Sequence, residues 1–390
     1  MLNRGICLCT IGLLAAAVFC SSSHAADKTP GKSTRNDAES APLERVAWRD
    51  ENQQPQERTG RVLVEAADGG LLLIGQDGRL WTIDKGQLVS RQDVGKSFRP
   101  LSAAALGKQL KAELGDGFDV ISTKHYVIGT SASREYARWC GALFERLFTS
   151  FHNYWKQRGL KLSEPEFPLV ALVFSGEKEF AAFATKDAGA DSATARGYFS
   201  IGSNRMVMYD LTAGAQGDIA GILAAAPFNI ATVIHEATHQ IAFNSGMHTR
   251  YADNPLWLVE GMAMYFETPD LTSKSGWKTA GAVNDLRLGQ FEEFAAERRK
   301  PDSLATLISS DGRFTDAEQM ADAYAEAWAL SHFLIRTKKE AYVKYLATLA
   351  AKPRLVWNTP EERLQEFRAV FGDDLGQLNA EMLRHLKKLK

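Results

Sequence analysis

Apolar residues follow two different spacings along the chain, and the change of spacing separates strands from helices. Between residues 60 and 90, short apolar runs alternate with turns rich in Gly and Asp, which predicts a β-meander or a small barrel. The runs lie at 61–66, 71–74 and 79–83. We interpret this region as a structural or weak interaction module.

Residues 118–211 combine strand-like runs with one long amphipathic helix. The strand-like runs lie at 119–129, 168–174, 197–200 and 205–210. Between the first two, apolar residues from Tyr136 to Tyr154 recur in steps of three and four, which predicts a helix with one buried face. The run 168–174 is almost wholly apolar, as in a central strand. The run 205–210 is the candidate edge strand for pairing with an extended peptide.

From residue 227 onward the spacing is almost entirely helical. Thr359, Pro360 and Glu362 fit a capping box with proline at the first helical position, and Gly372 suits the end of that helix. Because strands come first and helices last, we expect an α+β fold preceded by a small β domain.

The first 25 residues are typical of an export signal. Arg4 precedes an apolar run at 6–19 that is short for a transmembrane helix, and small residues at the cleavage spacing end at Ala25. Cleavage after Ala25 predicts an exported chain, periplasmic or secreted, with no stable membrane insertion afterwards. An uncleaved N-terminal anchor is the main alternative. A lipoprotein attached through Cys20 is a weaker one, because the bulky Phe19 precedes the cysteine.

Composition narrows the class of protein further. With 45% hydrophobic residues, 24% charged residues and a net charge of -1, the 390-residue chain is typical of a globular protein, and it lacks the basic surplus of a nucleic-acid binder. Residues 26–58 are rich in charged residues, Gln, Ser and Pro, which predicts a flexible linker. Cys140 remains after signal cleavage and lies on the apolar helical face, so we expect a small core residue.

The clearest candidate chemistry lies in an HExxH motif formed by His235, Glu236 and His239. Residues four apart share one face of a helix, so the two imidazoles meet at a spacing that suits zinc. Glu236 lies one step round the helix, where a carboxylate can take a proton from a metal-bound water without ligating the metal. Unpaired, these groups would be costly on an otherwise apolar helix. A chance match is the alternative.

A second helix is predicted to follow, capped by Asn254 and begun by Pro255, as Asn229 is expected to cap the first. Glu260 sits among apolar neighbours, where an unpartnered carboxylate would be costly. Two histidines and this glutamate make three ligands and leave the fourth position for water, as catalytic zinc requires. We therefore expect one Zn²⁺ per chain. A cap or salt bridge elsewhere is the alternative role of Glu260.

These two segments, HEATHQ at 235–240 and WLVEGMAMYFE at 257–267, resemble the gluzincin metallopeptidases. More narrowly, they are similar to the bacterial peptidase MA-like proteins and to a related exported family labelled a domain of unknown function. The resemblance covers residues 118–388, with softer matches at 122–126, 197–200 and 324–328. It implies a zincin-like domain with a mixed sheet in its upper part, a helical lower part and a cleft between them.

The expected organisation has five segments. They are a signal peptide, a linker, a β-meander domain, a connecting helix and a gluzincin domain, at residues 1–25, 26–58, 59–98, 99–117 and 118–390.

The resemblance also implies roles outside the triad. It suggests Tyr324 as the group that stabilises the oxyanion, with core packing of its ring as the alternative. His332, eight residues further along the same predicted helix, is a weaker candidate. Many gluzincins carry an aspartate four residues after the glutamate ligand, where this chain has Met264. Glu267 could take its place and orient the first histidine, or be an exposed helix-end carboxylate. His248 is a rival third ligand, but its spacing does not fit the astacin-like pattern, so we interpret it as a loop histidine.

The leading hypothesis is an exported zinc peptidase acting on peptide or protein substrates, with Glu236 as general base. A catalytically inactive, zinc-stabilised binding or scaffold protein of the same fold is the main alternative, since the usual aspartate is missing and a β domain is added. An adaptor whose helical half only packs is a third. These motifs specify neither endo- or exopeptidase action nor the oligomeric state.

Overall fold

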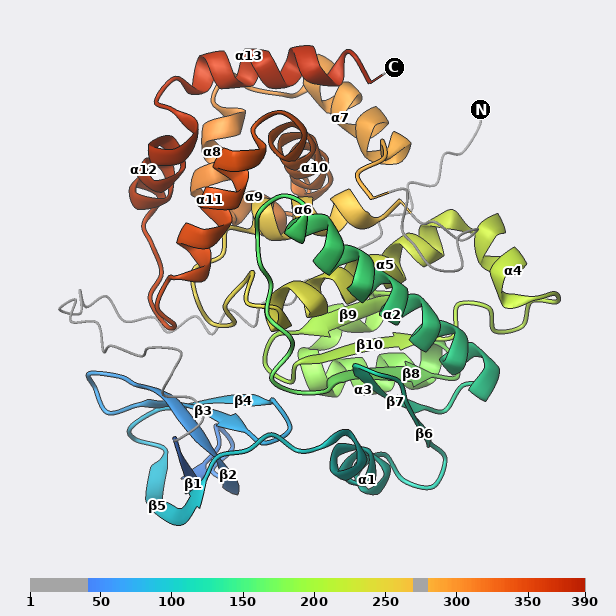
Figure 1. Cartoon of the computed structure of the whole chain (residues 1–390), viewed down its shortest axis with the longest axis vertical. Helices are drawn as coiled ribbons and strands as arrows, with labels where there is room; N and C mark the ends of the chain where they lie inside the picture. Colours follow the sequence, from blue (N-terminus) through green and yellow to red (C-terminus); the bar gives the residue numbers. More distant parts are fainter. Residues whose placement is uncertain (1–40, 269–279, 390) are drawn as a thin grey trace. The chain divides into compact units, whose positions relative to one another are not determined.

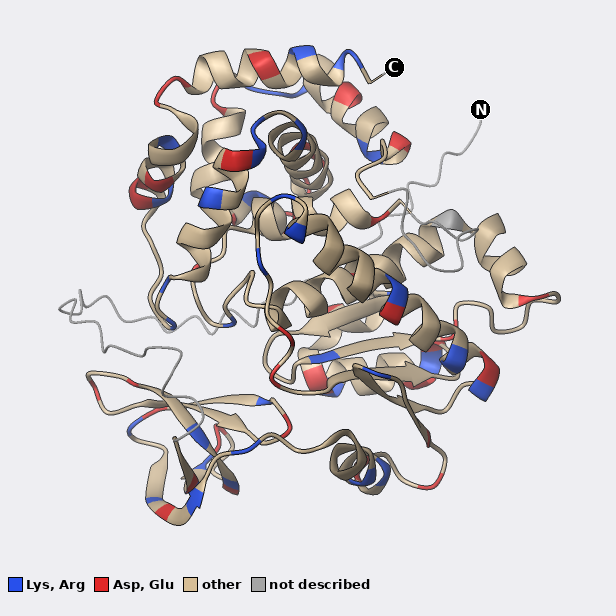
Figure 2. Ribbon diagram, in the orientation of Figure 1, with Lys and Arg blue, Asp and Glu red and all other residues tan. Residues whose placement is uncertain are grey.

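The structure, a computed structural model, describes residues 41–268 and 280–389 (Figure 1). The predicted signal peptide and the start of the predicted linker lie outside the described residues. The chain divides into two units: Met1–Gly141 with Pro165–Ala213, and Ala142–Glu164 with Gly214–Lys390. In each unit, basic and acidic residues are interspersed along the described helices and strands (Figure 2).

The first unit begins with a five-stranded antiparallel sheet in the order β4-β3-β2-β1-β5. Its strands are β1 (Pro42–Arg49), β2 (Pro55–Glu65), β3 (Leu71–Gly75), β4 (Leu80–Ile83) and β5 (Leu88–Ser97). The meander prediction is confirmed for β2 to β4, but the linker prediction is wrong from Pro42 onward. Val46 and Trp48 alternate along β1 and pack with Leu73 and Ile83. The prediction of a linker rests on the many charged residues of segment 26–58, and this short alternation is too brief to change that composition.

The second sheet has the order β6-β7-β8-β10-β9. Its strands are β6 (Asp119–Ser122), β7 (Tyr126–Thr130), β8 (Leu169–Phe174), β9 (Gly197–Ser200) and β10 (Arg205–Tyr209). Strands β7, β8 and β10 are parallel, whereas β6 and β9 are antiparallel edge strands. The single strand predicted at 119–129 is a hairpin, because Thr123 and Tyr126 close a turn. The edge-strand prediction for 205–210 is wrong, since β10 pairs on both sides.

Two helices of this unit flank the second sheet. Helix α3 (Glu177–Ala188) packs on β8 and β10, and α1 (Ala103–Leu114) packs on β6 and β7 and agrees with the predicted connecting helix. Near the end of α1, the carboxylate of Glu113 accepts two hydrogen bonds from Arg205 at 2.7 and 2.8 Å. It accepts two more from Arg79 at 2.7 and 2.6 Å. This ion-pair cluster ties the two sheets together.

The second unit is built from helices. They are α2 (Arg134–Lys156), which begins in the first unit, α4 (Ile219–Ala225), α5 (Pro227–Asn244), α6 (Leu256–Phe266), α7 (Asp285–Glu297), α8 (Ser303–Ser309), α9 (Gly312–Thr315), α10 (Met320–Thr337), α11 (Lys339–Ala350), α12 (Pro360–Phe371) and α13 (Leu375–Leu386). Helix α10 lies in the middle and contacts α6, α7, α8, α9, α11 and α13 (Figure 1). The helical pattern predicted from residue 227 onward is confirmed.

Several local predictions are also confirmed. Thr359 and Glu362 form a capping box on α12, and Gly372 ends that helix with φ at 99°. Cys140 is fully buried in α2. Among the described helices, no single one is long and apolar enough to cross a bilayer. The bent pair of α4 with Phe228–Asn244 passes that test of length and composition when its two helices are taken together.

The predicted caps of the two helices that carry the motifs are wrong. Helix α5 begins at Pro227, ahead of Asn229. Asn254 does not cap α6, because its amide donates to backbone carbonyls of the preceding loop. The N–H of Leu256 at the start of α6 is instead accepted by Asp311 Oδ1 at 2.9 Å. A distant carboxylate has replaced the local cap that the sequence suggested.

Candidate metal centre

The HExxH motif lies in the second half of α5, where nearly every residue is buried. His235 and His239 are at most 1% exposed. Their ring centroids lie 4.5 Å apart with the planes at 85°, and their Nε2 atoms are 2.9 Å apart. The helix therefore brings two imidazole nitrogens to one point, as the spacing predicted.

Glu260 reaches the same point from α6. At the next position, Gly261 lets α6 approach α10 at backbone contact, since a Cβ there would lie 2.4 Å from the carbonyl oxygen of Ala327. Glu260 is fully buried, and its Oε2 lies 3.0 Å from His235 Nε2 and 3.7 Å from His239 Nε2. The close packing that glycine permits thus sets α6 where its carboxylate meets both histidines.

The three ligand atoms fit a metal ion. Metal bonds of about 2.0–2.2 Å in a tetrahedral arrangement place ligand atoms about 3.3–3.6 Å apart. The separations here are 2.9, 3.0 and 3.7 Å. The second oxygen of Glu260, Oε1, is buried without a hydrogen-bond partner among the described residues, which is costly unless a cation neutralises it. This His-His-Glu triad could therefore hold a metal ion.

Glu267 stands behind His235. The Nδ1–H of His235 donates to Glu267 Oε1 at 2.7 Å, which fixes the tautomer that leaves Nε2 for a metal. Asn284 Nδ2 donates to Glu267 Oε2 at 3.0 Å, and Arg287 Nη2 lies 3.9 Å from Oε1. Glu267 is only 5% exposed, so it is not the solvated helix-end carboxylate of the alternative interpretation. Met264, where the resemblance leads us to expect an aspartate, is fully buried and lies one turn before Glu267.

Asn284 and Arg287 are the site residues that sequence reasoning missed. Both belong to the start of α7, where Asn284 is the N-cap and accepts from the backbone N–H of Arg287. An asparagine ahead of an amphipathic run signals a helix start, but no spacing rule connects that start to Glu267. Only the packing of α7 shows the link.

Burial and charge set the protonation of the triad. Burial lowers the pKa of His235, but Glu260 and Glu267 outweigh it and raise that pKa to about 10. At His239 burial prevails, and its pKa is lowered. Burial raises the pKa of Glu260, yet the two imidazoles bring it down to about 2. A proton and a metal ion therefore compete for Nε2 of His235, beside Glu260.

Glu236 and Tyr324 lie beside the triad. Glu236 follows His235 on α5 and is 1% exposed. Tyr324, on α10, is 7% exposed and packs edge-on against Phe314 with ring centroids 5.4 Å apart. Burial, and then the charges of Glu260 and Glu236, raise the pKa of Tyr324 well above its usual value. Its hydroxyl therefore stays protonated at neutral pH, next to the carboxylates.

The two remaining candidate histidines are not part of the triad. His332 Nδ1 lies 3.1 Å from His385 Nε2 on α13, so its nearest imidazole partner is at the C-terminal helix. His248 packs on Phe243 with ring centroids 5.2 Å apart, and burial lowers its pKa to about 3, so it is neutral. The group of converging ligand atoms contains neither of them.

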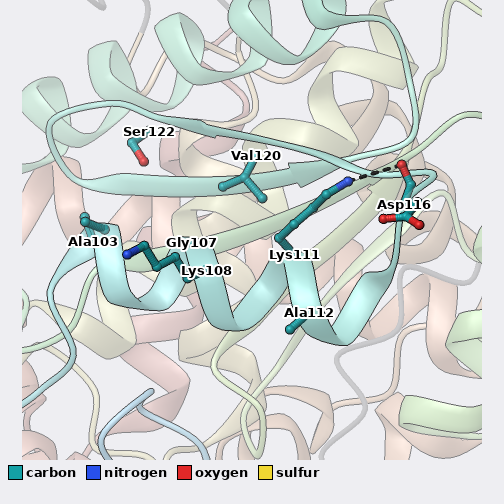
Figure 3. A pocket seen from close by; sticks show the side chains of 9 residues that line it. Ala103, Gly107, Lys108, Lys111, Ala112, Asp116, Val120 and Ser122 are labelled. Atoms are coloured by element: carbon teal, nitrogen blue, oxygen red, sulfur yellow. Dashed lines mark hydrogen bonds between the residues drawn. The ribbon is translucent and has the colours of Figure 1, made fainter.

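A separate cavity of about 540 Å³ lies in the first unit between α1 and β6 (Figure 3). Small side chains such as Ala103 and Ala112 line it, together with Val120. Lys111 bends back to donate to the backbone carbonyls of Gly115 and Asp116. The ammonium of Lys111 is thus used within the fold, and we assign no chemistry to this cavity.

Comparison with known proteins adds one match. Residues 229–356 match a family described as a protein of unknown function, DUF1570. The matched stretch begins near the start of α5 and ends beyond α11, so it contains the triad, Glu236, Glu267 and Tyr324. No curated protein matches the chain.

Proposed function

We propose that the chain is an exported zinc-dependent peptidase of the gluzincin type. The observation that carries the proposal is the convergence of His235, His239 and Glu260, with one buried oxygen of Glu260 left without a hydrogen-bond partner among the described residues. Two histidines and a glutamate with an open fourth position are a donor set of catalytic zinc. Export to the periplasm or the medium rests on the predicted signal at residues 1–25.

Each residue beside the triad has a chemical task. Bound there, zinc supplies a Lewis acid that polarises the scissile carbonyl and acidifies the attacking water. Glu236 takes the proton of that water and passes it to the leaving nitrogen. The protonated Tyr324 hydroxyl donates a hydrogen bond to the developing oxyanion. Glu267 holds the ring of His235 in one orientation.

The test compares the mature wild-type chain with Glu236→Gln on a peptide library, with zinc content measured on the same samples. We expect the variant to keep one zinc per chain and to lose about 10²–10⁴-fold in rate, the contribution of a positioned base. Glu293→Gln is the matched control, because that side chain is 64% exposed on α7. Full turnover in Glu236→Gln would refute the role of the base. Zinc-loaded wild-type protein that cleaves no peptide at any pH would favour the inactive scaffold.

A further inference from the structure

The loop that joins the two ligand-bearing helices is held by a second, distant segment. Residues 245–255 connect α5 to α6, and residues 350–355, which run from the last residue of α11 into the link to α12, lie against them. The backbone N–H of Leu355 donates to the carbonyl of Tyr251 at 2.6 Å. A β-bridge outside the two sheets joins the same segments. The start of α6 is thus tied to a part of the chain about a hundred residues away.

Both partners of that hydrogen bond have an unusual backbone conformation. The φ angle of Tyr251 is 60° and that of Leu355 is 62°. Bulky residues seldom adopt this left-handed region, and they persist there only where the surrounding structure over-determines it. Two such residues in one contact, at the loop between the ligand helices, indicate that this contact is kept despite its local cost.

A buried ionic network adds to the same contact. The side chain of Asp253 is fully buried, and Lys352 Nζ donates to its Oδ2 at 2.8 Å. Arg363 of α12 donates to Asp253 Oδ1 at 2.5 Å and to Asp311 Oδ2 at 2.9 Å. Asp311 in turn accepts the N–H of Leu256, the first residue of α6. One network therefore holds both the loop and the amino end of the helix that carries Glu260.

We propose that Tyr251, Asp253 and Leu355 are positioning residues that fix the rotation of α6 and so hold Glu260 against the two histidines. Side-chain atoms lie about 5–6 Å from a helix axis, so a rotation of about 10° moves the carboxylate by about 1 Å. Metal–ligand distances tolerate only about 0.2 Å. Gly261 secures the middle of α6 against α10. We call the contacts of Tyr251, Asp253 and Leu355 the brace. The brace secures the amino end of α6, whose own N-cap residue supplies no side-chain cap.

The experiment measures the zinc affinity of the mature chain by chelator competition, together with the melting temperature of the zinc-free form. Asp253→Asn weakens one arm of the network, and we expect zinc affinity to fall at least tenfold. Leu355→Gly keeps the N–H that bonds Tyr251 but relieves the left-handed strain, so the zinc-free melting temperature should stay equal or rise. Because glycine makes this backbone more flexible, it should hold α6 less firmly, and we expect zinc affinity to fall several-fold. A residue that only supports the fold would not give that split. Glu113→Gln, in the first unit, is the control that lowers stability and leaves zinc affinity unchanged.

The possible outcomes separate the brace from the peptidase proposal. Wild-type zinc affinity in both variants would overturn the brace, because packing on α10 would then suffice. If Asp253→Asn does not fold, the result for Leu355→Gly decides alone. Zinc-loaded wild-type protein without peptidase activity would remove the proposed function, while weakened binding in the variants would still support the brace. A wild-type chain that binds no zinc would overturn both.

Discussion

Removing the carboxylate of Glu267 should weaken metal binding although no ligand is lost. Its hydrogen bond fixes the ring of His235, and loss of such a partner costs about 10–100-fold in metal affinity, or about 1.4–2.7 kcal/mol. Glu267→Gln keeps an acceptor oxygen, so we expect about a tenfold loss. Glu267→Ala should approach a hundredfold, because it also leaves the guanidinium of Arg287, 3.9 Å away, without its buried counter-ion.

Chelator competition on the purified chain gives the zinc dissociation constants directly. Glu293→Gln on α7 serves as the exposed control and should match the wild type. The order wild type, Glu267→Gln, Glu267→Ala is the expected ranking of affinity. If Glu267→Ala binds zinc within twofold of the wild type, packing alone orients His235 and the reasoning is refuted.

Three further predictions concern the oxyanion, the packing of α6 and the response to acid. Tyr324→Phe should retain zinc and lower kcat by about 10²–10³-fold, the effect of removing an oxyanion donor, and steady-state kinetics with metal analysis checks it. Gly261→Ala should destabilise the fold by about 1–3 kcal/mol or more in denaturant titrations, since its Cβ would lie 2.4 Å from the carbonyl of Ala327, whereas Gly289→Ala has open space and should be neutral or stabilising. Burial raises the pKa of Glu113, but its two arginine partners outweigh that and hold the pKa at about 2, against an ordinary value of 4.5. The stability from Glu113 is therefore present above pH 4.5 and is lost as the pH falls towards 2, and Glu113→Gln should flatten an acid-unfolding curve in that window.

The triad was predictable because its geometry is encoded locally. Two histidines one turn apart face the same way on any helix, and a carboxylate in an apolar run needs a partner wherever that run packs. The contacts of Asn284 and Arg287 with Glu267 were not predictable, because these residues approach Glu267 only through tertiary packing. The caps failed for the same reason, since Asp311 accepts an N–H fifty-five residues away in sequence.

The errors in the sheets have a different physical origin. The composition of residues 26–58 predicts a linker over β1, because the few buried apolar residues of this strand lie among charged ones and a composition over 33 residues does not resolve them. The sequence leads us to expect an edge strand at 205–210, although Arg205–Met208 of β10 are all buried. The residues of a strand say little about whether it is a central or an edge strand, because that position depends on which other strands pair with it.

The resemblance leads us to expect a carboxylate four residues after Glu260, where the chain has Met264, and the structure has Glu267 behind His235 instead. On a helix with about 100° per residue, the fourth position after Glu260 is rotated by about 40°, whereas the seventh is rotated by only about 20° in the other direction. Glu267 therefore shares the face of Glu260 at least as well as Met264 does, but lies about 4.5 Å further along the axis. The longer glutamate side chain spans that extra distance, and a longer side chain needs more restraint. Asn284 and Arg287 supply that restraint, and so keep Glu267 where it can orient the ring of His235 for a metal ion.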